Sequence, residues 1–222
     1  MPTGTLHVRV DEKRAVSVAY IEPEGRGSGV VFVYAPGAGS NMHDPFGRYA
    51  SGELAAHGLM CLRMQFPYME EKRKAPDRTP VLEATWRAVI AEARALSDKL
   101  VVGGRSMGGR IASQVVAQGE AVDALALFAY PLHSPAKPDV WRDAHLPAIT
   151  APTLFCSGTR DAFASPEELQ AVAKTMKRAA VHLLDGADHG YAVPAASGRK
   201  REDVWREAVE AGLTWLKEAR VL

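Results

Sequence analysis

The chain has 222 residues, of which 47% are hydrophobic and 24% are charged, and its formal net charge is only +1. So small a charge provides no bulk attraction to nucleic acid or to an anionic membrane, and the chain has no acidic excess of the kind that favours disorder. The length and composition predict one globular domain over residues 1–222.

Two further features concern the cellular location. Cys61 and Cys156 lie within apolar stretches, which is typical of buried, reduced thiols. The first sixteen residues lack the apolar core of a secretory signal, and no apolar run reaches the roughly 20 residues of a membrane span. We therefore expect a cytoplasmic protein with no membrane and no nucleic-acid partner.

Short apolar or β-branched runs alternate along the chain with segments of helical periodicity, which predicts an α/β fold with a mainly parallel sheet covered by helices on both faces. Strands are expected at 5–11, 15–22, 28–35, 59–66, 99–104, 124–130, 152–158 and 180–186. The first two are close enough in sequence to pair antiparallel at one edge. Helices are expected at 46–57, 79–96, 107–118, 166–177 and 202–219.

Two segments interrupt this alternation. Residues 67–80 are charged and contain several prolines, which predicts a solvated loop. Residues 130–152 contain five prolines, which disfavour a long helix. The second segment is also too short to form a cap domain.

The strongest chemical motif is Gly104-Arg105-Ser106-Met107-Gly108, which follows a predicted strand and precedes a predicted helix. A serine displayed on so sharp a turn needs small residues two positions before and two positions after it, because a Cβ there would meet crowded backbone. Both positions are glycine. The turn would expose the Ser106 hydroxyl and direct the Met107 N–H toward an oxyanion. The alternative is a small-residue turn with a capping serine.

A serine nucleophile needs a base and a third group that orients the base. Asp161 follows the strand at 152–158, and His189 follows the last predicted strand. The order Ser106, Asp161, His189 is the one expected when the serine occupies a strand-to-helix turn.

Each of these assignments has an alternative. Asp161 could shape its own turn or pair with Arg160. Asp185 and Asp188 lie too close to the histidine in sequence to be the first choice of partner. His133 and His145, in the proline-rich segment, are the competing bases.

The loop after the strand at 28–35 contains glycines that allow backbone N–H groups to face a ligand. Ala38 is expected to supply the second oxyanion donor beside Met107, with Gly39 as the alternative. His43 and Asp44 could contact substrate, although capping of the next helix by Asn41 or Asp44 explains the same polar cluster.

With these turns assembled, the chain resembles the α/β-hydrolase superfamily over about residues 30–216. The stretches "GGRSMGGRIAS", "YPLHSPAKPDVWRDAHL", "PTLFCSGTRDAF" and "DGADHGY" look like a small lidless branch of predicted or dienelactone-hydrolase-like hydrolases, related to animal testis-expressed proteins and chromatin-complex subunits. The resemblance implies about eight strands, mostly parallel, no cap domain, and nucleophile, acid and base roles for Ser106, Asp161 and His189.

Two positions depart from relatives in that superfamily. Many of them begin the oxyanion loop with His-Gly, whereas this chain has Pro36-Gly37. Dienelactone hydrolases proper use a cysteine nucleophile where Ser106 stands, so their substrate is not carried over.

These observations predict a serine hydrolase, a carboxylesterase or thioesterase, that acts on a small-molecule acyl substrate through an acyl-enzyme and needs no metal or organic cofactor. Without a cap, the cleft is expected to be open, with walls from Tyr130, His133, Phe163 and Tyr191, each of which could instead belong to the core. The alternatives are a non-catalytic interaction protein that keeps the fold and a peptidase of the same fold.

Overall fold

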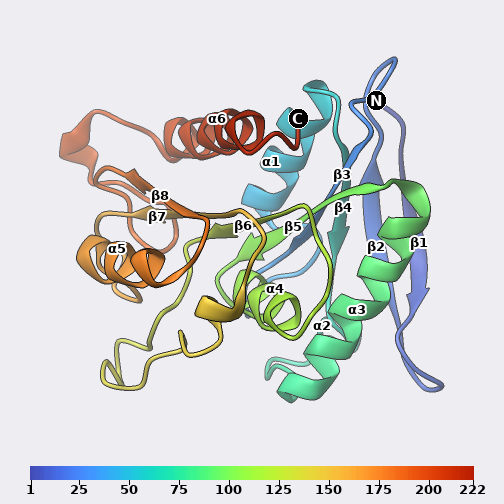
Figure 1. Cartoon of the computed structure of the whole chain (residues 1–222), viewed down its shortest axis with the longest axis horizontal. Helices are drawn as coiled ribbons and strands as arrows, with labels where there is room; N and C mark the ends of the chain where they lie inside the picture. Colours follow the sequence, from blue (N-terminus) through green and yellow to red (C-terminus); the bar gives the residue numbers. More distant parts are fainter.

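Eight strands form one continuous sheet in a computed structural model that describes residues 1–222 (Figure 1). The strands are β1 (Thr3–Arg9), β2 (Ala15–Ile21), β3 (Val30–Ala35), β4 (Met60–Met64), β5 (Lys99–Arg105), β6 (Ala124–Phe128), β7 (Thr153–Gly158) and β8 (Ala179–Leu184). Their order is β1-β2-β4-β3-β5-β6-β7-β8. β1 and β2 pair antiparallel at one edge, as the sequence predicts, β2 also pairs antiparallel with β4, and the six strands from β3 to β8 are parallel to one another.

Helices cover both faces of the sheet. They are α1 (Pro45–Ala56), α2 (Pro67–Glu70), α3 (Thr79–Leu96), α4 (Met107–Ala117), α5 (Pro166–Thr175) and α6 (Arg201–Glu218). α1 and α6 pack together on one face, and α3, α4 and α5 lie on the other (Figure 1). None of the helices has the length and apolar character required to cross a membrane.

The central strand β3 shows how the sequence builds two cores. All six of its residues are buried, and because successive strand residues point to opposite faces, they divide between the two layers. The odd-numbered ones join the core under α3 and α4, and the even-numbered ones join the core under α1 and α6. The indole Nε1 of Trp86 donates to the Gly108 carbonyl at 3.2 Å, which ties α3 to the first turn of α4.

The prediction for residues 67–80 needs a correction. The segment begins with the short helix α2, in which Tyr68 and Met69 are buried in the core beneath α3 and α4. The Glu70 carboxylate also accepts a hydrogen bond from the Ser17 backbone N–H of β2. Apolar residues at the start of a charged segment therefore anchor it, and only the remainder, from Glu71 on, is mostly exposed.

The expectations for the proline-rich segment and for the burial of the two cysteines hold. The proline-rich segment 130–152 contains one 3₁₀ turn, η1 (Leu146–Ala148), and no cap domain interrupts the connections between strands. Cys61 and Cys156 are buried and unpaired, and burial raises the pKa of the Cys61 thiol to about 12.

Candidate active site

Ser106 occupies the turn between β5 and α4 with a strained backbone. Its φ of 52° and ψ of −118° lie in a region that non-glycine residues seldom adopt. The turn is held against the neighbouring strand so closely that a Cβ at Gly104 or Gly108 would lie 2.3 or 2.2 Å from the Ala35 carbonyl oxygen. The two glycines are therefore required by the approach of this turn to β3.

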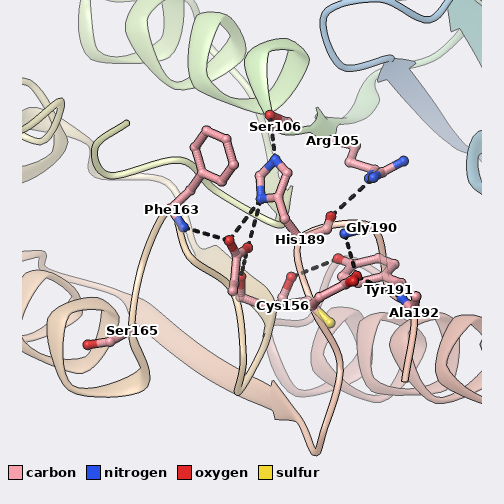
Figure 2. Close-up of polar contacts among 12 residues, drawn as sticks. Arg105, Ser106, Cys156, Phe163, Ser165, His189, Gly190, Tyr191 and Ala192 are labelled. Atoms are coloured by element: carbon pink, nitrogen blue, oxygen red, sulfur yellow. Dashed lines mark hydrogen bonds and ion pairs between the residues drawn. The ribbon is translucent and has the colours of Figure 1, made fainter. Parts of the chain in front are cut away.

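A continuous chain of hydrogen bonds joins three residues from separate loops (Figure 2). The Nε2 atom of His189 lies 2.9 Å from the Ser106 Oγ, and its Nδ1 lies 2.9 Å from each carboxylate oxygen of Asp161. The tautomer that donates Nδ1–H to the carboxylate leaves Nε2 free to accept the serine proton. The structure thus brings together the three residues singled out in the sequence.

The Asp161 carboxylate is fully buried and has further donors. Its Oδ1 accepts from the Phe163 backbone N–H at 2.8 Å, and its Oδ2 accepts from the Ser157 hydroxyl at 3.2 Å. The Phe163 ring stacks on the imidazole of His189 with a centroid distance of 4.1 Å. These contacts satisfy the buried charge and fix the plane of the imidazole.

The loop that carries His189 is closed by its own aspartate. One carboxylate oxygen of Asp188 accepts from the backbone N–H groups of Gly190 and Ala192 at 2.8 and 2.9 Å (Figure 2). Asp188, an alternative partner for the imidazole on sequence grounds, therefore shapes the loop, whereas Asp161 contacts the ring.

A second network connects the segment between β3 and α1 to the loop that carries His189. The Asp44 carboxylate, which is 3% exposed, accepts from the Tyr34 hydroxyl at 2.7 Å and caps α1 through the Gly47 N–H at 2.8 Å. The same carboxylate lies 3.7 Å from the Arg105 guanidinium, whose Nη2 donates to the His189 carbonyl at 3.1 Å. Asp44 thus acts as a helix cap, one of the two interpretations of its position, and also pairs with the residue that precedes Ser106.

The two competing histidines lie elsewhere. His145 Nε2 lies 2.7 Å from the hydroxyl of the fully buried Ser113. Burial, together with the nearby Arg110, lowers the pKa of His145 to about 4. His133 Nε2 lies 3.1 Å from a carboxylate oxygen of Glu168. Neither histidine contacts Ser106, and no carboxylate pairs with His145 to orient it.

A cleft of about 480 Å³ opens beside Ser106. Of the residues predicted from the sequence, it is lined by Ser106, His189, Ala38, Met107 and Phe163, but not by Gly39. Met107 is the first residue of α4, so its backbone N–H has no partner one turn earlier in the helix. Ala38 and Met107, the two residues whose backbone N–H groups were predicted as oxyanion donors, therefore line the same cleft as Ser106.

The predicted wall of the cleft is corrected at three positions. Tyr130, His133 and Tyr191 are at most 7% exposed and do not line the cleft. The Tyr191 hydroxyl donates to the Cys156 carbonyl at 2.8 Å, and the Tyr130 hydroxyl donates to the Arg142 carbonyl at 2.9 Å. Both tyrosine rings are therefore core residues, with a buried apolar ring and a hydroxyl that bonds within the protein. Burial raises the pKa of Tyr130 to about 12.

Sequence reasoning missed part of the lining. Arg110 and Arg142 both line the cleft, together with Pro131 and Gly37. The sequence left open whether Arg105 or Arg110 recognises a substrate anion, and Arg110 lies one helical turn after Ser106. Arg142 had no signal in the sequence, because its position depends on the course of the segment 130–152. No group of three or more His, Cys, Asp or Glu side chains has an arrangement that could hold a metal ion.

The fold is that of an alpha/beta hydrolase, and comparison with known proteins agrees with this class. A family model described as an alpha/beta hydrolase domain matches residues 28–217, and the chain belongs to this family.

Solved structures of three proteins, among others, share this fold. A serine hydrolase without a lid from Xanthomonas campestris is 19% identical with a TM-score of 0.75, covering 97% of this chain and 96% of that one. A dienelactone hydrolase from Anabaena variabilis is 20% identical with a TM-score of 0.70, covering 98% and 97%. An esterase domain from Rhodothermus marinus is 15% identical with a TM-score of 0.73, covering 98% and 99%.

The close approach at Gly108 leads to a first prediction. In Gly108→Ala the new Cβ would lie 2.2 Å from the Ala35 carbonyl oxygen and 2.6 Å from that of Pro36, so we expect destabilisation of about 1–3 kcal/mol or more. The matched control is Gly52→Ala in α1, where nothing lies within 4 Å of the new Cβ; there we expect a gain of roughly 0.5–1 kcal/mol. Urea unfolding measures both. Equal effects of the two substitutions would contradict the proposed steric cause.

The Asp44 network leads to a second prediction. Asp44→Asn keeps the size of the side chain but leaves Arg105 without its carboxylate, so we expect a loss of about 1–3 kcal/mol in the free energy of unfolding. Tyr34→Phe removes one neutral donor to the same carboxylate and should cost only about 1 kcal/mol. The two variants are compared by urea denaturation. If Asp44→Asn proves no worse than Tyr34→Phe, the negative charge contributes nothing.

Proposed function

We propose that this alpha/beta hydrolase is a serine carboxylesterase or thioesterase that acts on a small-molecule acyl substrate. The observation that carries the proposal is the unbroken chain of hydrogen bonds from the Ser106 hydroxyl through His189 to the buried Asp161 carboxylate. A scaffold that only binds partners has no need of a strained serine, an oriented imidazole and a buried carboxylate in one line.

In the first half of the reaction, Ser106 Oγ attacks the carbonyl carbon of the substrate while His189 Nε2 removes the hydroxyl proton. Asp161 holds the Nδ1–H of the imidazole and stabilises the imidazolium that forms. The protonated His189 then gives its proton to the departing alkoxide or thiolate, and the acyl group remains on the serine.

The tetrahedral intermediate carries a negative charge on the former carbonyl oxygen. We assign the Met107 N–H, at the positive end of α4, as one donor to this oxygen and the Ala38 N–H as the second. The position of Ala38 in the cleft lining, from which Gly39 is absent, supports the choice of Ala38.

In the second half of the reaction, His189 takes a proton from water, and the resulting hydroxide attacks the acyl carbon. The acid is released, and the proton returns to Ser106. The chain's own residues account for every proton in this sequence, so the proposal requires no cofactor.

The nucleophile assignment has a direct test. A fluorophosphonate probe should label the wild type at Ser106, because the oriented imidazole activates this hydroxyl. In Ser106→Ala the label should disappear, and kcat/KM for a 4-nitrophenyl ester should fall by at least about a thousandfold. The control is Ser113→Ala, which removes the other serine that bonds a histidine and should retain the label.

Two outcomes of this experiment count against the proposal. A folded wild type that takes up no probe would favour the non-catalytic interaction protein. A label that persists in Ser106→Ala would place the nucleophile at another residue.

The choice of ester over amide is tested with matched substrates. An open cleft without a lid, and the likeness to a protein named as an esterase domain, favour a small ester or thioester. We expect kcat/KM for 4-nitrophenyl acetate to exceed that for the corresponding 4-nitroanilide by at least about a thousandfold, because the amine is the poorer leaving group. Aminoacyl amides cleaved as fast as the matching esters would instead indicate a peptidase.

A further inference from the structure

The cleft beside Ser106 carries positive charge that the chain does not neutralise. Three arginines line it, Arg105, Arg110 and Arg142, and no aspartate or glutamate does. Arg105 is engaged with Asp44 and with the His189 carbonyl. The guanidinium groups of Arg110 and Arg142 form no ion pair and no hydrogen bond within the protein.

These two guanidinium groups also affect each other. Burial and the nearby Arg142 lower the pKa of the Arg110 guanidinium, because two like charges that share the lining of one cleft repel each other. Charged side chains are seldom buried without a partner, because removing them from water is costly. An arrangement of two unpaired cations at the wall of a cleft is typical of a site that binds an anion.

The neighbouring carboxylates do not line the cleft and form no ion pair with Arg110 or Arg142. Asp143 and Glu83 act electrostatically on His145, but Asp143 forms no ion pair and Glu83 pairs with Arg87. His145 itself is neutral near pH 7, since its pKa is lowered to about 4. Among the residues that line this wall of the cleft, the charges are therefore those of the two arginines.

The backbone on either side of the cleft holds these arginines in place. Arg110 follows Ser106 by one turn of α4, a rise of about 5.4 Å. Arg142 lies in the segment 130–152, where its N–H donates to the Leu132 carbonyl at 2.7 Å and its carbonyl accepts from the Tyr130 hydroxyl at 2.9 Å. The corrected role of Tyr130 is thus to fix the backbone that carries Arg142.

We propose that Arg110 and Arg142 form a subsite for a carboxylate, so that the preferred substrate is an ester or thioester bearing a free carboxylate close to the scissile bond. A guanidinium presents paired N–H donors whose spacing matches the two oxygens of a carboxylate. The inference rests on the proposed function, with Ser106 as the nucleophile. It further specifies that the preferred substrate carries a negative charge.

The test compares charged and neutral esters of the same shape. Mono-4-nitrophenyl adipate carries the carboxylate on the acyl side and is compared with its methyl ester. 4-Acetoxybenzoate carries it on the leaving group and is compared with methyl 4-acetoxybenzoate. We expect the wild type to prefer the charged member of at least one pair by about tenfold or more in kcat/KM. The pair that shows the preference identifies the side of the scissile bond that faces the arginines.

Arg110→Gln and Arg142→Gln should each reduce this preference by about tenfold, and added salt should weaken it in the wild type. The control is Arg178→Gln, which removes an exposed arginine without an ion pair and should leave the preference unchanged. Because each cleft variant removes one of two repelling charges, its melting temperature should be equal to or above that of the wild type. A lower melting temperature with an unchanged preference would indicate a structural role and overturn the proposal.

A binding measurement separates this inference from the proposed function. Ser106→Ala, which keeps both arginines, is titrated with monomethyl adipate and with dimethyl adipate, and NMR shifts report binding. Tighter binding of the charged ester, lost in the double variants with Arg110→Gln or Arg142→Gln, supports the subsite even if no ester is hydrolysed. Equal binding of the two esters, or hydrolysis at Ser106 with no charge preference, overturns the subsite and leaves the nucleophile assignment intact.

Discussion

The contact between the β5–α4 turn and the end of β3 is the constraint on which the rest of the site depends. Carbonyl oxygens at the end of β3 lie so close to this turn that Gly104 and Gly108 have no room for a side chain. The same compression holds Ser106 at a positive φ, and the resulting strain is balanced by the packing of α4 against the sheet and by the bond from Trp86 to the Gly108 carbonyl. Backbone contacts therefore determine the position of the serine, and they include a hydrogen bond of 2.9 Å from the Ser106 N–H to the Phe128 carbonyl of β6.

Asp44 and Arg105 connect two loops that are far apart in the sequence, the loop after β3 and the loop that carries His189, on either side of that turn. Asp44 caps α1, just after the loop that we propose stabilises the oxyanion, and Arg105 precedes Ser106 and donates to the carbonyl of His189. A single ion pair between a buried carboxylate and a partly buried guanidinium therefore connects this loop with the loop that carries the imidazole. This chain has Pro36-Gly37 where many relatives have His-Gly. Near that loop, the polar contacts are made by Asp44 with Ser40 and with Arg105.

The charge of the cleft contrasts with that of the whole chain. The formal net charge of +1 provides almost no bulk attraction for a charged partner, yet two arginines without ion pairs line the cleft beside Ser106. A substrate in the cleft would contact the local positive charge of Arg110 in α4 and Arg142 in the segment 130–152. In a cleft that is partly screened from water, such fixed charges act more strongly than they do on an open surface.

The sequence by itself determined the alternation of strands and helices, the antiparallel edge and the glycine-flanked serine, because these depend on local periodicity and on steric limits within a few residues. It also singled out Asp161 and His189 by their places after strands whose carboxyl ends share one edge. Only the tertiary structure decided between core and cleft for Tyr130, His133 and Tyr191, and only it placed Arg142 at the cleft, since burial and side-chain partners come from segments distant in sequence. The short helix α2 was missed for the same reason: its apolar residues are few, and the core they enter is built by other parts of the chain.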